Sequence, residues 1–71
     1  MKLVTKKACP ACSLAKAQAN KKGIAIDIVD FDSDQGQEIV KESGCVKMPI
    51  LESDDGKFYC GTDAVDFIKS L

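Results

Sequence analysis

The chain has 71 residues, of which 45% are apolar and 30% charged, and its formal net charge is −1 at pH 7. This length predicts one domain over residues 1–71, because so short a chain buries only about 60% of its unfolded surface and can build only a small core. No apolar run approaches the roughly 18 residues of a membrane span, so we expect no membrane partner. We expect no secretory leader and therefore a cytoplasmic protein. The lack of arginine argues against a nucleic-acid partner, and we expect a monomer.

The first half of the chain predicts a strand, a helix and a second strand. The first strand is expected over Lys2–Thr5, and the helix from about Pro10 to Lys22, where Gly23 ends it. The inward face of this helix is expected to comprise Ala11, Leu14, Ala15 and Ala19. Alternating isoleucines predict the next strand over Ile24–Phe31. Strand, helix and strand within about thirty residues form a βαβ unit, so the two strands should be parallel with a right-handed crossover.

The middle of the chain predicts a second helix. Ser33 or Asp34 is expected to cap its start, because short polar side chains accept hydrogen bonds from the first backbone amides. Ile39 and Val40 should turn inward, and Gly44 should end the helix.

The C-terminal part predicts a hairpin followed by a helix. Strands are expected over Met48–Glu52 and Lys57–Cys60, and the Asp55-Gly56 step between them is a strong hairpin signal. Thr62 is expected to cap the last helix. The residues that this helix should bury are Ala64 or Val65, Ile68 and Leu71. The predicted order, βαβαββα, is that of an α/β fold.

Cys9 and Cys12 lie one helical turn apart, where the first strand gives way to the first helix. A helix start presents unpaired N–H groups and the positive end of the dipole, and both stabilise a thiolate. We therefore expect Cys9 to be the ionised nucleophile and Cys12 to close a disulfide with it. Pro10 suits the first helical position because it lacks an N–H.

Charge is distributed unevenly along the chain. Residues 1–23 contain six lysines and no acid, whereas residues 24–71 contain all eleven acids. A positive potential should therefore surround the cysteine pair and attract anionic thiols or acidic protein surfaces. Because the chain has no histidine, activation of the thiol must come from the helix start and from lysines such as Lys6 and Lys7.

Three motifs together make the chain resemble the thioredoxin fold and, within it, a small glutaredoxin. The motifs are Cys9-Pro10-Ala11-Cys12 after the first strand, Met48-Pro49 at the third strand and Gly61-Thr62-Asp63 at the last helix. The resemblance spans the whole chain and implies a thioredoxin-like α/β fold with helices on both faces of a four-stranded mixed sheet of order 2-1-3-4. It also implies that Pro49 is a cis-proline beside the cysteines, which leaves the Met48 backbone free to pair with a substrate.

The resemblance also implies a glutathione site. Lys6 matches a lysine that meets the glycine-end carboxylate, and the Met48 backbone matches the group that pairs with the cysteinyl part. The γ-glutamyl end would be met at the start of the last helix, by Gly61, Thr62 and Asp63. A helix N-terminus independently suits a carboxylate, and Asp63 could pair with the adjacent ammonium group.

The chain departs from the family pattern in three respects. Ala11 replaces a tyrosine that forms one wall of the cleft, Lys47-Met48 replaces a threonine-valine pair, and Cys60 stands where a glycine is expected. Ala11 and the Lys47-Met48 pair favour an alternative, a glutathione-independent redoxin reduced by thioredoxin reductase.

The predicted function is thiol–disulfide exchange that reduces protein disulfides or glutathione mixed disulfides. Cys9 and Cys12 carry the reaction with Pro10 and Pro49 beside them, while Lys6, Ala11, Met48, Pro49, Gly61, Thr62 and Asp63 bind the substrate. No bound cofactor or metal is expected, and glutathione is the expected co-substrate. The expected reductant is glutathione or thioredoxin reductase. Ribonucleotide reductase is one candidate acceptor of the electrons. The alternative of another class is an iron–sulfur cluster or metal carrier, which the lack of histidines and of a second CxxC pair disfavours.

Two further cysteines, Cys45 and Cys60, allow two interpretations. Free cysteine packs well in cores, so both can simply be small apolar residues. Alternatively they are auxiliary thiols open to oxidation or glutathionylation, since Cys60 precedes the predicted ligand-binding turn and Cys45 lies four residues before Pro49.

Overall fold

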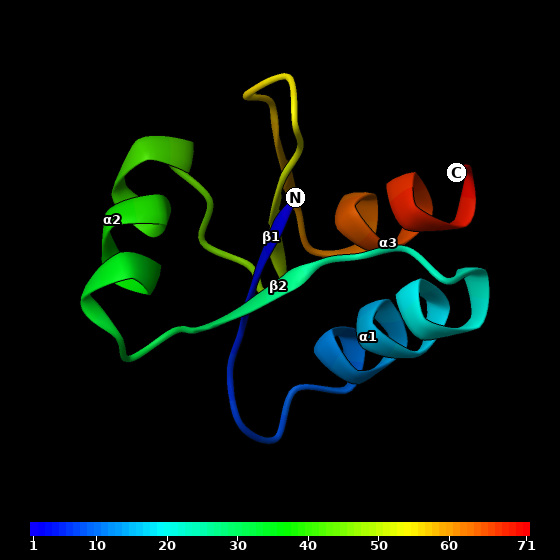
Figure 1. The fold of residues 1–71 in the computed structure, drawn as a ribbon. Coiled ribbons are helices and arrows are strands. Elements are labelled where there is room, and N and C mark those ends of the chain that lie inside the picture. The colour runs from blue at the N-terminus through cyan, green and yellow to red at the C-terminus, as the bar shows by residue number, and fades with distance from the viewer.

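The computed structural model describes residues 1–71 as four strands and three helices in the predicted order (Figure 1). The elements are β1 (Lys2–Thr5), α1 (Pro10–Lys22), β2 (Asp27–Asp30), α2 (Asp34–Ser43), β3 (Ile50–Glu52), β4 (Phe58–Cys60) and α3 (Thr62–Lys69). No helix is both long and apolar enough to cross a membrane.

The strands form one mixed sheet of order β2-β1-β3-β4, which confirms the predicted thioredoxin-like topology. β1 runs parallel to β2 and antiparallel to β3, and β3 is antiparallel to β4. A parallel neighbour needs a crossover, which α1 supplies, whereas the antiparallel β3 and β4 are joined directly by a hairpin.

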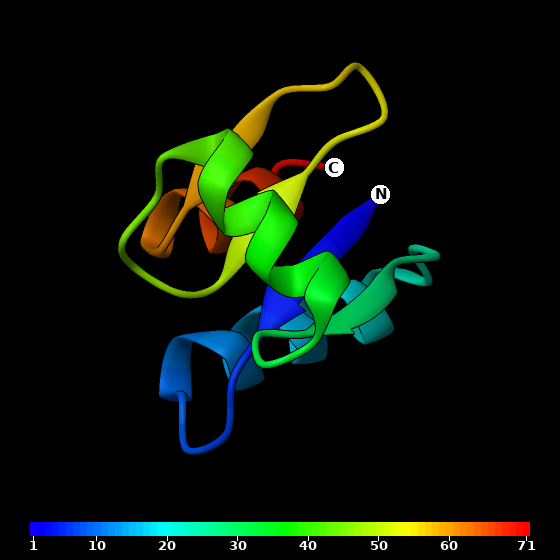
Figure 2. The same ribbon diagram turned by 90° about the vertical axis from the view of Figure 1, so that its left-hand side faces the viewer.

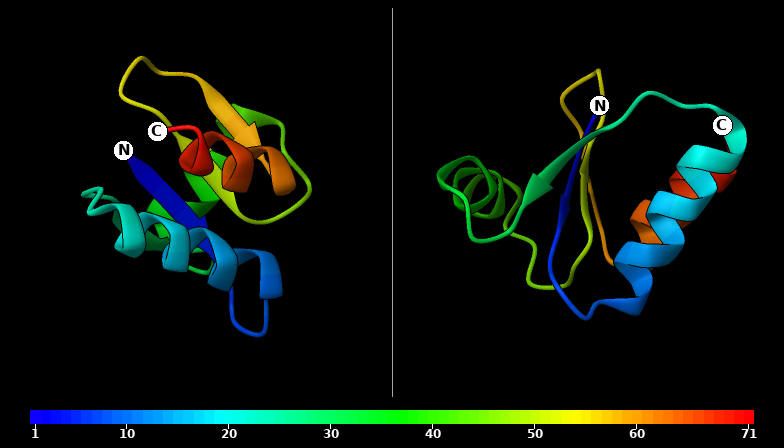
Figure 3. Two further views of the ribbon diagram at one scale, coloured as in Figure 1. Left: turned by 90° about the vertical axis from the view of Figure 1, so that its right-hand side faces the viewer. Right: turned by 60° about the horizontal axis from the view of Figure 1, so that its bottom comes forward.

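The helices cover both faces of the sheet, with α2 on one face and α1 and α3 on the other (Figure 1). Figure 2 shows α2 lying across its face of the sheet, and Figure 3 shows α1 and α3 side by side on theirs. Because successive strand residues point to opposite faces, β1 contributes Leu3 to one core and Val4 to the other. β3 does the same with Leu51 and Ile50.

Helix boundaries follow the predicted capping residues at four positions. Ser33 caps α2, its Oγ accepting a hydrogen bond from the Gly36 amide over 3.0 Å. Gly23 and Gly44 follow α1 and α2 in the left-handed conformation, both with φ of 67°, which glycine adopts without steric cost. Pro10 is the first residue of α1.

The inward face of α1 differs from the prediction. Leu14 is 56% exposed, and the buried residues of the helix are Cys12, Ala15 and Ala19. The reason is that α1 shares its face of the sheet with α3. The buried side of α1 therefore faces both the sheet and α3. The alanines allow close approach, and Leu14 lies outside the contact.

Four further predictions about elements were wrong. β2 is shorter than the strand predicted over 24–31, because Ile24 and Ile26 pack against the core from the loop before it. β3 is shorter than the strand predicted over 48–52, because it begins only after the cis Met48–Pro49 bond. Thr62 is the first residue of α3 rather than its cap; Gly61 holds the cap position and provides no side-chain hydrogen bond. Leu71 is 52% exposed because α3 ends at Lys69.

Candidate active site

Sheet topology brings three separate segments to one end of the molecule. The C-terminal end of β1 pairs with the N-terminal end of β3 through Val4 and Ile50, and Ile50 also pairs with Cys60 at the C-terminal end of β4. The chain segments just outside these strand ends must therefore lie close together. This end is opposite the β3–β4 hairpin turn, as Figure 1 shows.

These segments enclose a cavity of about 440 Å³, called here the Cys9 cleft. It is lined by Lys6, Ala8, Cys9, Pro10, Ala11, Val46, Lys47, Met48, Gly61 and Thr62. Seven of the residues singled out in the sequence are thus brought together: Lys6, Cys9, Pro10, Ala11, Met48, Gly61 and Thr62. Cys12 and Pro49 do not line the cleft because both are fully buried.

Cys9 occupies the N-cap position of α1, with extended backbone angles. Its Sγ accepts a hydrogen bond from the Cys12 amide over 3.2 Å, and its carbonyl accepts one from Ser13 over 3.1 Å. Cys9 and Cys12 are joined by a disulfide, with Cα atoms 5.2 Å apart. Since Cys12 is buried and Cys9 lines the cleft, Cys9 offers the sulfur that an external reagent can reach.

The loop before Cys9 turns at Ala8, whose φ of 55° lies in the left-handed region. This conformation is uncommon for a residue with a side chain, and it turns the chain from β1 into the start of α1. Ala8 was not singled out from the sequence, because alanine carries no turn signal of its own.

One wall of the Cys9 cleft consists of residues 46–48, which lead into the cis Met48–Pro49 bond. Their backbone makes no hydrogen bond with any other backbone group. The Pro49 carbonyl, one residue further on, accepts a hydrogen bond from the Gly61 amide over 2.8 Å. The Met48 backbone is therefore unpaired beside the cleft that contains Cys9.

Two lysines line the cleft, Lys6 from the segment after β1 and Lys47 from the 46–48 wall. Lys6 Nζ also lies over the Phe31 ring, 5.1 Å from its centroid. A neighbouring cavity of about 300 Å³ is lined in part by Lys6, Lys7 and Lys16. The cleft and its surroundings thus carry positive charge.

The other lysines of α1 lie away from the cleft. Lys22 Nζ donates hydrogen bonds to the carbonyls of Lys69 and Leu71, over 2.5 and 3.4 Å, and so ties the end of α1 to the end of the chain. Lys21, its neighbour, is exposed in the last turn of α1.

Asp63 is exposed and does not line the cleft, although its neighbour Thr62 does. Besides Ala8, two lining residues were not singled out as binding residues: Val46, which is 92% exposed, and Lys47. Both precede Met48, so their nearness in sequence to Pro49 was the available signal.

Cys45 and Cys60 form a second disulfide, with Cα atoms 5.8 Å apart. Both interpretations drawn from the sequence treated them as separate thiols; their pairing was missed because it depends on the path of the loop after α2. No group of three or more His, Cys, Asp or Glu side chains is close enough to hold a metal ion.

Comparison with known proteins agrees with this geometry. The sequence model of the glutaredoxin family matches residues 1–58, which include both cysteines of the CxxC motif and Pro49. The search of curated proteins found no match. The match and the adjacent cysteine pair support thiol–disulfide oxidoreductase chemistry, and the chain belongs to the glutaredoxin family.

Proposed function

We propose that this protein is a thiol–disulfide oxidoreductase that reduces disulfides through Cys9 and Cys12, with glutathione as co-substrate. The observation that carries the proposal is the position of Cys9, which caps α1 and lines an open cleft. Its sulfur accepts a hydrogen bond from the Cys12 amide. An amide donor and a helix start both favour the thiolate, and the thiolate is the form that attacks disulfides.

The proposed reaction has two exchange steps. Cys9 thiolate attacks one sulfur of the substrate disulfide, forms a mixed disulfide and releases the other sulfur as a thiolate. Cys12 then loses its proton and attacks Cys9 Sγ, which closes the Cys9–Cys12 disulfide and releases the second product thiol. Two electrons pass from the dithiol to the substrate, and two glutathione molecules restore the dithiol by becoming glutathione disulfide.

Glutathione suits the charge and shape of the cleft. Its carboxylates would meet Lys6, Lys47 and the start of α3 at Thr62, all of which line the cleft. The unpaired Met48 backbone would pair with the cysteinyl part, beside Pro49. A reducing compartment such as the cytoplasm would supply this co-substrate.

A second candidate is a glutathione-independent redoxin that accepts electrons from thioredoxin reductase and passes them to protein disulfides, such as that of ribonucleotide reductase. The exposed Val46 at the cleft rim favours it, because an apolar side chain there suits a protein surface. The position of Asp63 outside the cleft also favours it, since one predicted contact to glutathione is then missing.

A Cys12→Ser variant separates the two candidates. With glutathione as co-substrate, the variant should still turn over glutathione mixed disulfides through Cys9 alone, because a second glutathione replaces Cys12. A dithiol-only redoxin should lose all turnover. The matched measurement compares how fast glutathione, or thioredoxin reductase with NADPH, reduces the oxidised wild type. Failure of the wild type to reduce any disulfide would contradict both candidates.

A further inference from the structure

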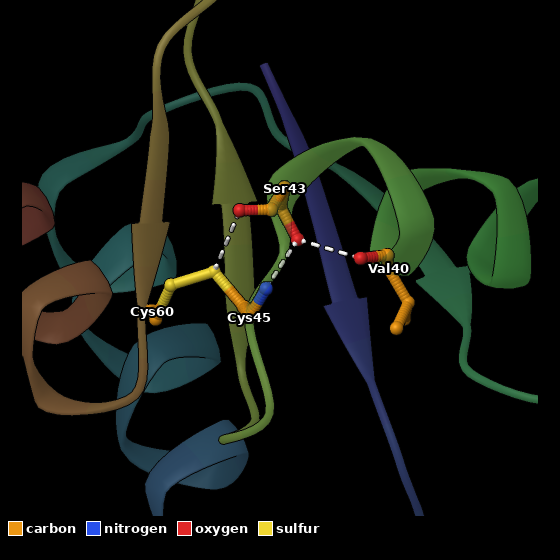
Figure 4. Close-up of a disulfide and its surroundings, with 4 residues drawn as sticks. All are labelled: Val40, Ser43, Cys45 and Cys60. Atoms are coloured by element: carbon orange, nitrogen blue, oxygen red, sulfur yellow. Dashed lines mark hydrogen bonds between the residues drawn. A yellow bond between two sulfur atoms is a disulfide. The ribbon is translucent and has the colours of Figure 1, made fainter.

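The second disulfide connects two segments that lead into the lining of the Cys9 cleft. Cys45 lies in the loop after α2, and Cys60 is the last residue of β4 (Figure 4). Their Cα separation of 5.8 Å is ordinary for a disulfide. The pair lies on the α2 face of the sheet, where Cys45 belongs to the core with Val4 and Ile50 and Cys60 packs against it.

Each of these cysteines directly precedes residues that line the cleft. Cys45 precedes Val46–Met48, and Cys60 precedes Gly61 and Thr62. The two sides fit closely, because a Cβ at Gly61 would lie 3.3 Å from the Lys47 Cβ. Gly61 also has φ of 58°, a conformation that favours glycine. The disulfide therefore links the 46–48 wall to the segment that brings Gly61 and Thr62 to the same cleft.

Residues 46–48 make no hydrogen bonds of their own, although Met48 packs against the core that contains Cys45. No backbone or side-chain hydrogen bond within the protein involves Val46, Lys47 or Met48. On the C-terminal side the segment is fixed by Pro49 and β3. On the N-terminal side it is fixed through Cys45, by its disulfide and by its amide, which donates to Ser43 Oγ over 3.1 Å (Figure 4).

From this arrangement we propose that Cys45 and Cys60 form a second thiol–disulfide site, distinct from Cys9 and Cys12, whose oxidised state orders the 46–48 wall of the Cys9 cleft. Reduction of the pair loosens that wall and slows the reaction of Cys9 with disulfides. The effect on reaction rate rests on the proposed function; the effect on the wall does not.

The chemistry requires an external dithiol. Its first thiolate attacks Sγ of Cys60, which is the more exposed of the two residues, since Cys45 is only 5% exposed. The Cys45–Cys60 bond breaks, and Cys45 leaves as a thiolate that takes a proton. The second thiol of the donor then attacks the donor's first sulfur, which is bonded to Cys60 Sγ in the mixed disulfide, and Cys60 is released as a thiolate that takes a proton. The donor ends as a cyclic disulfide, having given two electrons and two protons to the pair.

Loosening the wall affects binding because the Met48 backbone is the unpaired group that a substrate would meet. A segment already held in its bound conformation loses less entropy on binding than a mobile one. Without the disulfide, substrate must order residues 46–48 itself. We expect Cys9 to react with a disulfide roughly three- to tenfold more slowly.

The structural part is tested in a Cys9→Ser/Cys12→Ser variant, in which Cys45 and Cys60 are the only thiols. Backbone order parameters are measured by nitrogen-15 relaxation in the oxidised form and after reduction with dithiothreitol. The expected result is a fall at residues 46–48 from about 0.85 to below about 0.6, with α1 unchanged. Unchanged order parameters at 46–48 would overturn the proposal. Should the reduced form unfold, the same comparison is made on Cys45→Val/Cys60→Ala, whose valine replaces buried volume.

The functional part compares the wild type with Cys45→Ala/Cys60→Ala, both with Cys9 and Cys12 reduced and with Cys45–Cys60 intact in the wild type. The probe is 5,5′-dithiobis(2-nitrobenzoic acid). Val29→Ala is the control, because it weakens the same core from β2, on the far edge of the sheet from β4. Slower reaction in the double variant but not the control is expected, whereas equal rates in all three would refute the link to the cleft. An unreactive wild type would instead contradict the proposed function.

Discussion

The Cys12 amide donates a hydrogen bond to Cys9 Sγ over 3.2 Å, so the sulfur of Cys9 fills the place that a serine or aspartate oxygen takes at other helix starts. The same interaction that begins α1 therefore also favours negative charge on Cys9. Structure and proposed reactivity have one origin in the CxxC segment.

Lys6 is expected to attract anionic disulfides to the cleft. Lys6→Met should slow the reaction with glutathione disulfide roughly three- to tenfold at low ionic strength, and the difference should shrink as salt screens the charge. Lys21→Met is the matched control, because it removes the same charge from the exposed far end of α1. Equal rates for the two variants, measured by stopped-flow mixing, would exclude a role for Lys6.

The second disulfide should contribute to stability as well as to the shape of the cleft. It closes a loop of 15 residues, and loop-closure entropy predicts a contribution of about 3 kcal/mol. Cys45→Ala/Cys60→Ala should therefore unfold in urea with a free energy about 3 kcal/mol lower than the oxidised wild type. Reduction of the wild type should remove most of this difference. A variant as stable as the oxidised wild type would show that the bond constrains little.

Gly36 in α2 packs closely against the backbone at the end of β2. A Cβ at this position would lie 2.1 Å from the backbone oxygen of Asp30, which cannot move like a side chain. Gly36→Ala should lower the free energy of unfolding by about 3 kcal/mol, the upper end for overpacking. Glu38→Ala, on the exposed side of the same helix, is the control and should change it little. The measurement is chemical denaturation of both variants.

Asp55 makes the β3–β4 turn sensitive to acid. Its carboxylate accepts hydrogen bonds from Ser53 Oγ and from the Lys57 amide, and these lower the pKa of Asp55 below its ordinary value of 3.8. A lowered pKa in the folded state stabilises the fold fully above pH 3.8 and less as the pH falls through the folded value. The stability difference between wild type and Asp55→Asn should therefore shrink below that pH. A difference independent of pH would contradict this assignment.

Local signals predicted most of the fold. The caps at Ser33 and Gly44 and the hairpin signal at Asp55-Gly56 depend only on neighbouring residues, and the structure agrees with all of them. Leu14 was misplaced because the orientation of α1 is set by its packing against α3, which the periodicity of α1 alone does not contain. Thr62 was misplaced as a cap by one residue, within the usual uncertainty of helix ends.

The candidate site divides in the same way. Cys9 and Cys12 are neighbours in one helical turn, so their juxtaposition follows from sequence spacing. The Cys45–Cys60 disulfide joins residues 15 apart, and its formation depends on the pairing of β4 with β3 and on the loop after α2. Such tertiary relationships are absent from any local pattern. For this reason Cys45 and Cys60 were interpreted from the sequence as separate thiols.

The proposed reaction requires that the start of α1 keep Cys9 ionised near neutral pH. Its most direct test is the rate of alkylation of the reduced protein by iodoacetamide as a function of pH, resolved at Cys9 by mass spectrometry of peptides. We expect a midpoint at or below about pH 7.5, the range of activated cysteines, and faster reaction at Cys9 than at Cys12. A midpoint near pH 8.5, as for a cysteine in an unfolded peptide, would contradict the account.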